Sequence, residues 1–107
     1  TLGAGTTAFS SSNEITNSSG TAYTSGGATL TSVTPTSSGT TALCDFADVS
    51  FTSASFTANG ALIYNDTESG DPAVCAIAFG ADKTVTSGTF TIQFPTADAT
   101  NAIIRLA

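Results

Sequence analysis

Two pairs of carboxylates are the residues whose types and spacing could support chemistry in this chain. Asp45 lies close to Asp48 along the chain, and Glu68 lies equally close to Asp71. Paired carboxylates act as general acid and base in glycoside hydrolases. A sugar cleft also needs aromatic platforms and a substantial groove, and the chain has only two tyrosines beside its seven phenylalanines. We therefore expect these four residues to be solvated carboxylates of turns and strand edges.

The remaining catalytic side chains are scarce. The chain contains no histidine, which removes the commonest general base and the usual Ser–His and Cys–His pairs. Nothing singles out a nucleophile among the many serines, and no glycine-rich phosphate loop precedes a helix. The sequence therefore predicts a protein that is not an enzyme, with no catalytic residues and no cofactor.

One acidic loop offers a weak candidate for calcium. Asp66, Glu68 and Asp71 cluster beside Asn65, and such hard oxygen ligands on a turn can hold Ca²⁺. The spacing does not match the EF-hand pattern, because the distant glutamate of that pattern is missing. A plain acidic turn is the reading we prefer, and we expect no metal site.

The two cysteines, Cys44 and Cys75, lie within apolar runs. Their spacing fits no zinc pattern, and no histidine is present to complete one. We expect two small residues of the core. The alternative is a disulfide that joins two strands and stabilises a small domain.

The charge balance excludes two classes of partner. The formal net charge is −6, and Lys83 and Arg105 are the only basic residues. Two cations cannot neutralise a phosphate backbone, so we expect no nucleic-acid partner. The same deficit argues against binding to an anionic membrane surface, and no apolar stretch is long enough to span a bilayer.

The composition points to strands and loops. Threonine and serine together supply about a third of the residues, whereas charged residues are only 9%. Threonine favours strands because its β-branched side chain packs well on a pleated surface. Strong helix formers are few. The fold class that we predict is all-β.

Residues 42–107 carry the clearest strand patterns and form the predicted β-domain core. Segments 42–53 and 54–65 alternate, 65–72 is rich in turn formers, and Phe90, Ile92 and Phe94 alternate with polar residues. The run 73–79 is apolar throughout, which predicts a strand covered on both faces. We expect 81–88 to be a connection and 101–106 a closing strand. Such short strands predict a small antiparallel sandwich or barrel-like domain.

Residues 1–41 differ in composition from the rest of the chain. They are dense in Ser, Thr and Gly, and their large apolar residues are isolated. We expect an irregular, extended N-terminal arm with one or two short strands near 21–34, and a turn at 35–39. The arm and the core together form a single domain.

Four segments, taken in their order along the chain, resemble small structural proteins encoded in the head-gene region of tailed bacteriophages. They are 56–67 (FTANGALIYNDT), 76–85 (AIAFGADKTV), 88–94 (GTFTIQF) and 102–106 (AIIRL). The resemblance covers roughly residues 45–107, and residues 1–40 do not take part. Some of these phage proteins are capsid decoration (cement) proteins. The family has no binding motif that can be carried over to residues of this chain.

The resemblance implies a β-rich virion subunit without catalysis. It would decorate the outer surface of the capsid. Its partners would be the major capsid protein and further copies of itself, with which it would form a homotrimer. Assembly would take place in the cytoplasm of the bacterial host, where a reducing environment favours free thiols. Two alternatives remain: a tail, fibre or head–tail joining component, and a secreted or cell-surface β-sandwich module such as an adhesin or a pilin-like subunit.

Overall fold

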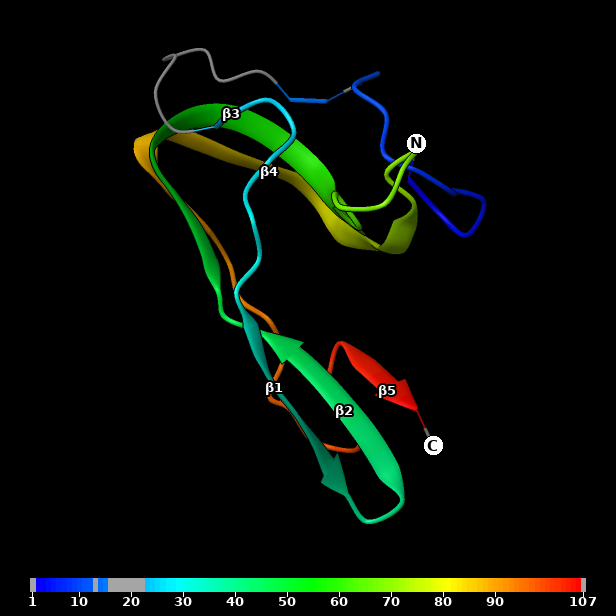
Figure 1. Cartoon of the computed structure of the whole chain (residues 1–107). Coiled ribbons are helices and arrows are strands. Elements are labelled where there is room, and N and C mark those ends of the chain that lie inside the picture. Colours follow the sequence, from blue (N-terminus) through cyan, green and yellow to red (C-terminus); the bar gives the residue numbers. More distant parts are fainter. Residues whose placement is uncertain (1, 13, 16–22, 107) are drawn as a thin grey trace.

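The computed structural model describes residues 2–12, 14–15 and 23–106. It is all-β and antiparallel, and the described residues contain no helix, which confirms the predicted fold class. Figure 1 shows two sheets at opposite ends of the molecule, one of three strands and one of two. The strands are β1 (Ser32–Ser38), β2 (Thr41–Phe46), β3 (Val49–Tyr64), β4 (Ala73–Ile92) and β5 (Ile104–Leu106).

The smaller strands form the sheet β1-β2-β5. β1 and β2 are joined by a tight turn at Gly39, whose φ of 60° favours glycine. The turn expected at 35–39 is therefore displaced, because Pro35 lies inside β1 where the register shifts between Val33 and Thr36. Proline is tolerated there because β1 is an edge strand.

The predicted boundary between arm and core, at residues 41 and 42, falls at this β1–β2 hairpin. β1 pairs with β2 and so belongs to the same sheet as part of the predicted core. The described residues before β1 contain no strand, and an isolated bridge between Ala8 and Pro72 is their one ladder contact. The irregular segment thus extends to residue 31, while residues 1, 13 and 16–22 lie outside the described part.

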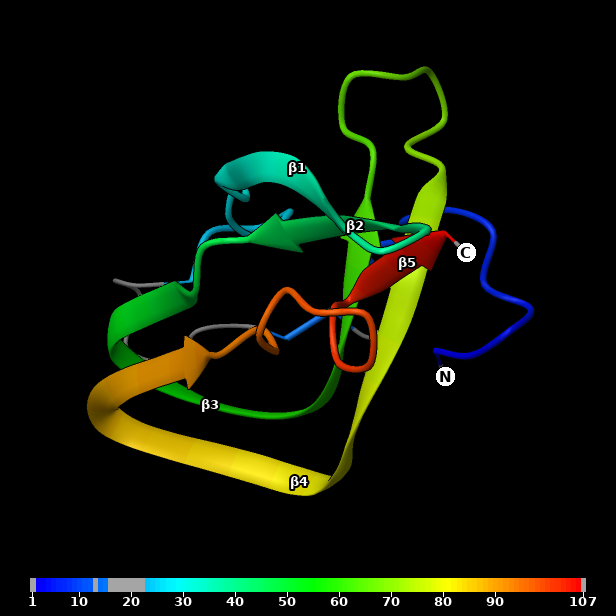
Figure 2. The ribbon, with the colours of Figure 1, turned by 90° about the horizontal axis from the view of Figure 1, so that it is seen from below.

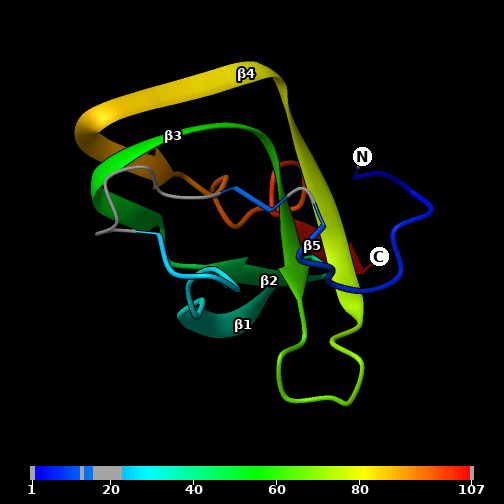
Figure 3. The ribbon, with the colours of Figure 1, turned by 90° about the horizontal axis from the view of Figure 1, so that it is seen from above.

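The other sheet is one long hairpin of β3 and β4, which is strongly bent (Figures 2 and 3). The expected division of 42–53 from 54–65 is wrong, because β3 runs through it, and the expected connection 81–88 lies inside β4. The bends coincide with shifts in register. Ser53, Gly80 and Ser87 lie at these shifts with positive φ angles, as β-bulges require.

Hydroxyl side chains pair across this hairpin on its exposed face. The hydroxyl oxygens of Ser50 and Thr91 lie 3.0 Å apart, and those of Thr57 and Thr84 lie 2.9 Å apart. Such cross-strand pairs stabilise a sheet by up to about 1 kcal/mol each. The abundance of Ser and Thr in the sequence is thus explained in part by a solvated sheet face.

The first half of β4 is covered on one face only, contrary to the expectation for 73–79. Cys75 and Ile77 are partly buried, whereas Val74, Ala76 and Ala78 are exposed. Val74 keeps 51% of its surface accessible. An uninterrupted apolar run indicates two covered faces only when a second layer is present, and this chain supplies no such layer among its described residues.

The core is thin and is divided between the two sheets. Its buried apolar residues are Ala54 and Phe56 in the bent hairpin, Leu43 in β2, and Ala102 just before β5. Aromatic rings surround Phe56: the centroid of Phe90 is 4.9 Å away and that of Tyr23 is 6.0 Å away. No large side chain among the described residues is completely buried.

The first residues of the chain cross the hairpin. The backbone N–H of Phe9 donates to the carbonyl of Asp71, and the N–H of Ala73 donates to the carbonyl of Thr7, both at 2.9 Å. An ideal Cβ on Gly60 would lie 3.7 Å from a methyl carbon of Leu2. These contacts join the irregular N-terminal segment to both strands of the hairpin.

Candidate functional site

The acidic loop that suggested calcium is held by hydrogen bonds between its own residues. The side-chain oxygen of Asn65 accepts hydrogen bonds from the N–H and the hydroxyl of Thr67, and the N–H of Asp71 donates to the carbonyl of Glu68. Gly70 and Asp71 both have positive φ angles. Within the described ranges, no group of three or more acidic, Cys or His side chains could hold a metal ion. Asp66, Glu68 and Asp71 are therefore not brought together as ligands.

The other carboxylate pair has structural partners. Asp45 accepts a hydrogen bond from the backbone N–H of Phe46 at 2.8 Å, and Asp48 accepts one from the N–H of Phe94 at 2.9 Å. Asp48 thus ties the start of β3 to the end of β4. These contacts explain both residues without any acid–base role.

The two cysteines are free thiols in different sheets, Cys44 in β2 and Cys75 in β4. Both are partly buried, and they form no disulfide with each other. Burial raises the pKa of the Cys75 thiol above its usual value. A raised pKa lowers the fraction of nucleophilic thiolate at neutral pH.

A polar cluster that the sequence patterns did not reveal joins the N-terminal segment to the end of β3. One oxygen of Glu14 accepts hydrogen bonds from the hydroxyl of Tyr23, 3.2 Å away, and from the N–H of Gly26, 2.6 Å away. The hydroxyl of Tyr64 donates to the carbonyl of Gly26 at 2.7 Å. The cluster joins three separate segments of the chain.

Burial raises the pKa values of both tyrosines in this cluster. Desolvation, and then the nearby Glu14 carboxylate, raise the pKa of Tyr23 to about 12. Burial also raises the pKa of Tyr64, with smaller contributions from Asp66, Asp71 and Glu14. The second oxygen of Glu14 is buried and has no hydrogen-bond partner among the described residues. Both phenols stay protonated at neutral pH, and their hydrogen bonds join the N-terminal segment to the end of β3.

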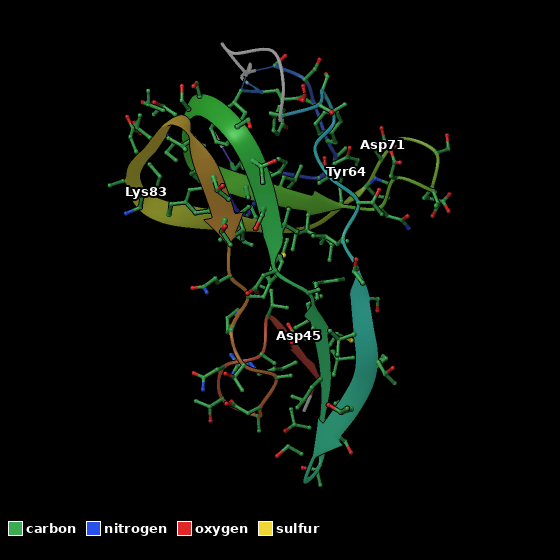
Figure 4. The ribbon with its side chains drawn as sticks, turned by 90° about the vertical axis from the view of Figure 1, so that its left-hand side faces the viewer. Asp45, Tyr64, Asp71 and Lys83 are labelled. Atoms are coloured by element: carbon green, nitrogen blue, oxygen red, sulfur yellow. The ribbon has the colours of Figure 1, made fainter. Side chains whose placement is uncertain are left out.

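Aromatic stacking reinforces the cluster. The rings of Phe9 and Tyr64 are stacked with their centroids 4.6 Å apart and 15° between their planes. Such a pair stabilises a fold by about 0.5–1.5 kcal/mol beyond its burial. Figure 4 shows Tyr64 near the end of β3, close to the loop that carries Asp71.

An open apolar groove of about 340 Å³ lies along β4 and the segment that follows it. Its apolar walls come from the middle and the end of β4 and from the segment before β5: Ile77, Phe79, Phe90, Ile92, Phe94 and Ile103. Lys83 is the one charged residue in its lining. Pockets that hold partners are typically apolar with few polar groups, so this groove is a candidate interaction surface.

Four further apolar side chains are exposed outside the groove lining. Val74 on β4 and Leu106 on β5 keep 51% and 70% of their surface accessible, and Leu2 and Val33 each keep 42%. They lie on four different segments. No helix in the described part of the chain is long and apolar enough to cross a membrane.

Sequence patterns missed the groove and the Glu14 cluster for different reasons. The alternation of Phe90, Ile92 and Phe94 did mark an apolar face, but it could not show that the face stays open. Glu14 had only one signal, a lone acidic residue within a segment of hydroxyl residues. Its partners, Tyr23 and Gly26, follow it by nine and twelve residues along the chain, and no local pattern marks the contact.

Comparisons with known proteins identify no family for the chain. No protein-family model matches the chain, and neither a curated protein nor a solved structure matches it significantly.

Proposed function

We propose that this chain is a structural subunit that completes its surface by assembly, and specifically a decoration subunit on the outer capsid of a tailed bacteriophage. The single observation that carries the first part is the extent of its accessible surface. The class of assembly rests on the resemblance of residues 45–107 to phage head-region proteins. The homotrimer and the contact with the major capsid protein belong to the same proposal.

The accessible surface is large for a protein of this mass. It measures 6796 Å² for 10.6 kDa, whereas a compact monomer of that mass exposes about 5,500 Å². The radius of gyration is 14.7 Å against about 13 Å for a compact chain of this length. A standard protein interface covers about 800 Å² on each partner. The excess is thus comparable to the area that one or two neighbouring subunits would cover.

The topology of the long hairpin supports the same proposal. Among the described strands, β3 and β4 pair only with each other, so neither edge of this sheet carries a third strand of the described part, and residues 7–9 meet the start of β4. Open edges of long strands favour pairing with another chain. In a virion subunit they would meet the lattice instead of aggregating.

Several of the side chains that could perform catalysis are engaged in the fold. Asp45 and Asp48 accept backbone hydrogen bonds, both tyrosine hydroxyls donate hydrogen bonds, and the thiols are partly buried. These contacts favour a structural role over an enzymatic one.

Cryo-electron microscopy of the purified particle that contains this chain tests the proposal. Ordered copies on the outer capsid lattice are the expected result, and they would identify the contacting segments. Copies confined to a tail or a vertex would support the joining or tail alternative and overturn decoration. A filament without capsids, or a cell-surface protein only, would overturn the virion role in favour of the adhesin or pilin-like alternative.

A further inference from the structure

The apolar groove and the tip of the long hairpin are two separate surfaces of the same strand pair. The groove contains Lys83, in the middle of β4, and the tip is the loop 65–72 with the residues that flank it. Figure 4 shows Lys83 well apart from Asp71, and Figures 2 and 3 show the tip projecting away from the rest of the molecule.

The groove lacks an acidic partner for its cation. Lys83 is exposed and pairs across the ladder with Ala58, and its neighbour Asp82 projects from the opposite face of the strand. The rest of the lining consists of phenylalanine and isoleucine side chains together with the uncharged Thr91, Gln93 and Pro95. The matching ligand therefore combines an apolar side chain with a carboxylate.

The hairpin tip presents that combination. Asp66 and Glu68 are exposed in the loop, and Val74, at the start of β4, keeps 51% of its surface accessible. The tip carries no basic residue, whereas the groove carries one cation and no anion. The two surfaces are complementary in charge, and each has apolar side chains beside its charges: Val74 next to the loop, and the phenylalanine and isoleucine walls in the groove.

We infer that the groove of one copy binds the hairpin tip of a second copy, with Val74 against the phenylalanine walls and Asp66 or Glu68 paired with Lys83. The inference rests on the proposed function, since it names the surfaces by which the subunits of such an assembly contact each other. Because the two surfaces differ, the contact is heterologous, and it closes into a ring or continues as a filament.

The area available is sufficient for this contact. The chain exposes about 1,300 Å² more than a compact monomer of its mass, and a head-to-tail contact uses two surfaces on every copy. Standard interfaces need about 800 Å² on each partner. A single chain cannot make the contact with itself, because Val74 and the groove residue Ile77 lie on opposite faces of the same strand.

A charge-reversal experiment on the isolated full chain tests the inference. Association is measured by sedimentation velocity and light scattering over a range of concentrations. Lys83→Glu is expected to weaken association about two- to five-fold, as for an exposed ion pair. Asp66→Lys combined with Glu68→Lys is expected to weaken it similarly, and the triple variant is expected to recover the wild-type association. Ile103→Asp, which places a carboxylate in the groove, is expected to weaken it more than ten-fold.

Thr89→Glu is the matched control, because it adds a negative charge to the exposed side of β4 outside the groove lining. Far-ultraviolet circular dichroism verifies that each variant is folded. A wild-type chain that stays monomeric at all concentrations overturns the inference, as does a triple variant that associates no better than Lys83→Glu. Decorated particles built from a chain that is monomeric in solution would overturn this contact and leave the proposed function standing. If the chain self-associates through this contact but is found on no virion, the contact stands and the proposed function is overturned.

Discussion

The hydroxyl group of Tyr64 donates a hydrogen bond to the backbone carbonyl of Gly26, and the two atoms lie 2.7 Å apart although 38 residues separate them along the chain. Gly26 in turn donates its N–H to Glu14. One short segment thus connects the end of β3 to the beginning of the chain. In a protein with so thin a core, such contacts account for a large share of the order in the N-terminal part.

Removal of this hydroxyl is expected to destabilise the protein modestly. Tyr64→Phe keeps the ring that stacks on Phe9 but deletes the donor, which costs about 1 kcal/mol for a typical hydrogen bond. Urea unfolding followed by circular dichroism measures the change. Tyr64→Ala, which also removes the stacked ring, is expected to cost more, and equal midpoints for all three proteins would contradict this account.

The Glu14 cluster predicts a late tyrosine titration. Burial and the Glu14 carboxylate raise the pKa of Tyr23 to about 12, whereas an unfolded tyrosine titrates near 10. The unfolded chain therefore loses its proton first, so the stability that Tyr23 contributes below about pH 10 is lost as the pH rises toward 12. Ultraviolet absorbance of tyrosinate follows the titration directly, because the chain has no tryptophan.

Two variants test whether the late titration belongs to Tyr23. Tyr23→Phe is expected to remove the late step, and Glu14→Gln is expected to move it to lower pH because the negative charge beside the phenol is gone. A folded protein in which both tyrosines titrate near their ordinary value would show that the cluster does not form in solution.

Gly60 is required by the close approach of β3 and β4. A Cβ at this position would lie 2.8 Å from the carbonyl oxygen of Ile77, which is backbone and cannot rotate away. Gly60→Ala is therefore expected to destabilise the fold by about 1–3 kcal/mol, as overpacking does. Gly5→Ala is the control, since a Cβ there meets nothing within 4 Å. Equal thermal stability of the two variants would contradict the register of the hairpin.

The thiols are expected to react as two free cysteines. A thiol reagent should label both Cys44 and Cys75 in the unfolded protein without prior reduction. In the folded protein Cys75 should react more slowly than a small-molecule thiol at neutral pH, because burial raises its pKa and limits access. Mass spectrometry of the labelled Cys75→Ser and Cys44→Ser variants assigns the rates. Recovery of an intramolecular disulfide from freshly purified protein would contradict this prediction.

Asp98 is expected to contribute to stability in mildly acidic solution. The side chain of Asn101, the N–H groups of Thr100 and Asn101, and the charge of Arg105 lower the pKa of Asp98. An unfolded aspartate titrates near 3.9, so this contribution is present above about pH 3.9 and is lost as the pH falls through the lower pKa of the folded state.

Two variants check the Asp98 turn. Asp98→Asn removes the charged acceptor, and Asn101→Ala removes the first of its partners. Both are expected to lower stability near neutral pH and to flatten its decline on the acid side, with the larger effect for Asp98→Asn. Thermal unfolding over a pH series gives the comparison, and an unchanged acid limb in both variants would contradict the role of this turn.

The sequence by itself determined the fold class, and it gave the expectations about chemistry that remain predictions. β-branched threonines, the alternation of Phe90, Ile92 and Phe94, and the turn formers of 65–72 act locally, so they could be interpreted without knowledge of the fold. The same holds for the consequences of having no histidine and only two cations.

The tertiary structure decided which strands pair, where the register shifts, and which apolar face stays open. The exposure of Val74 and the partly buried position of Ile77 depend on a second layer that a one-dimensional pattern cannot show to be missing. The contact of Glu14 with Gly26, and the groove at Phe90 and Ile103, likewise join residues from separate segments. These features follow from long-range pairing, whose free energy depends on the whole chain and not on any local stretch of it.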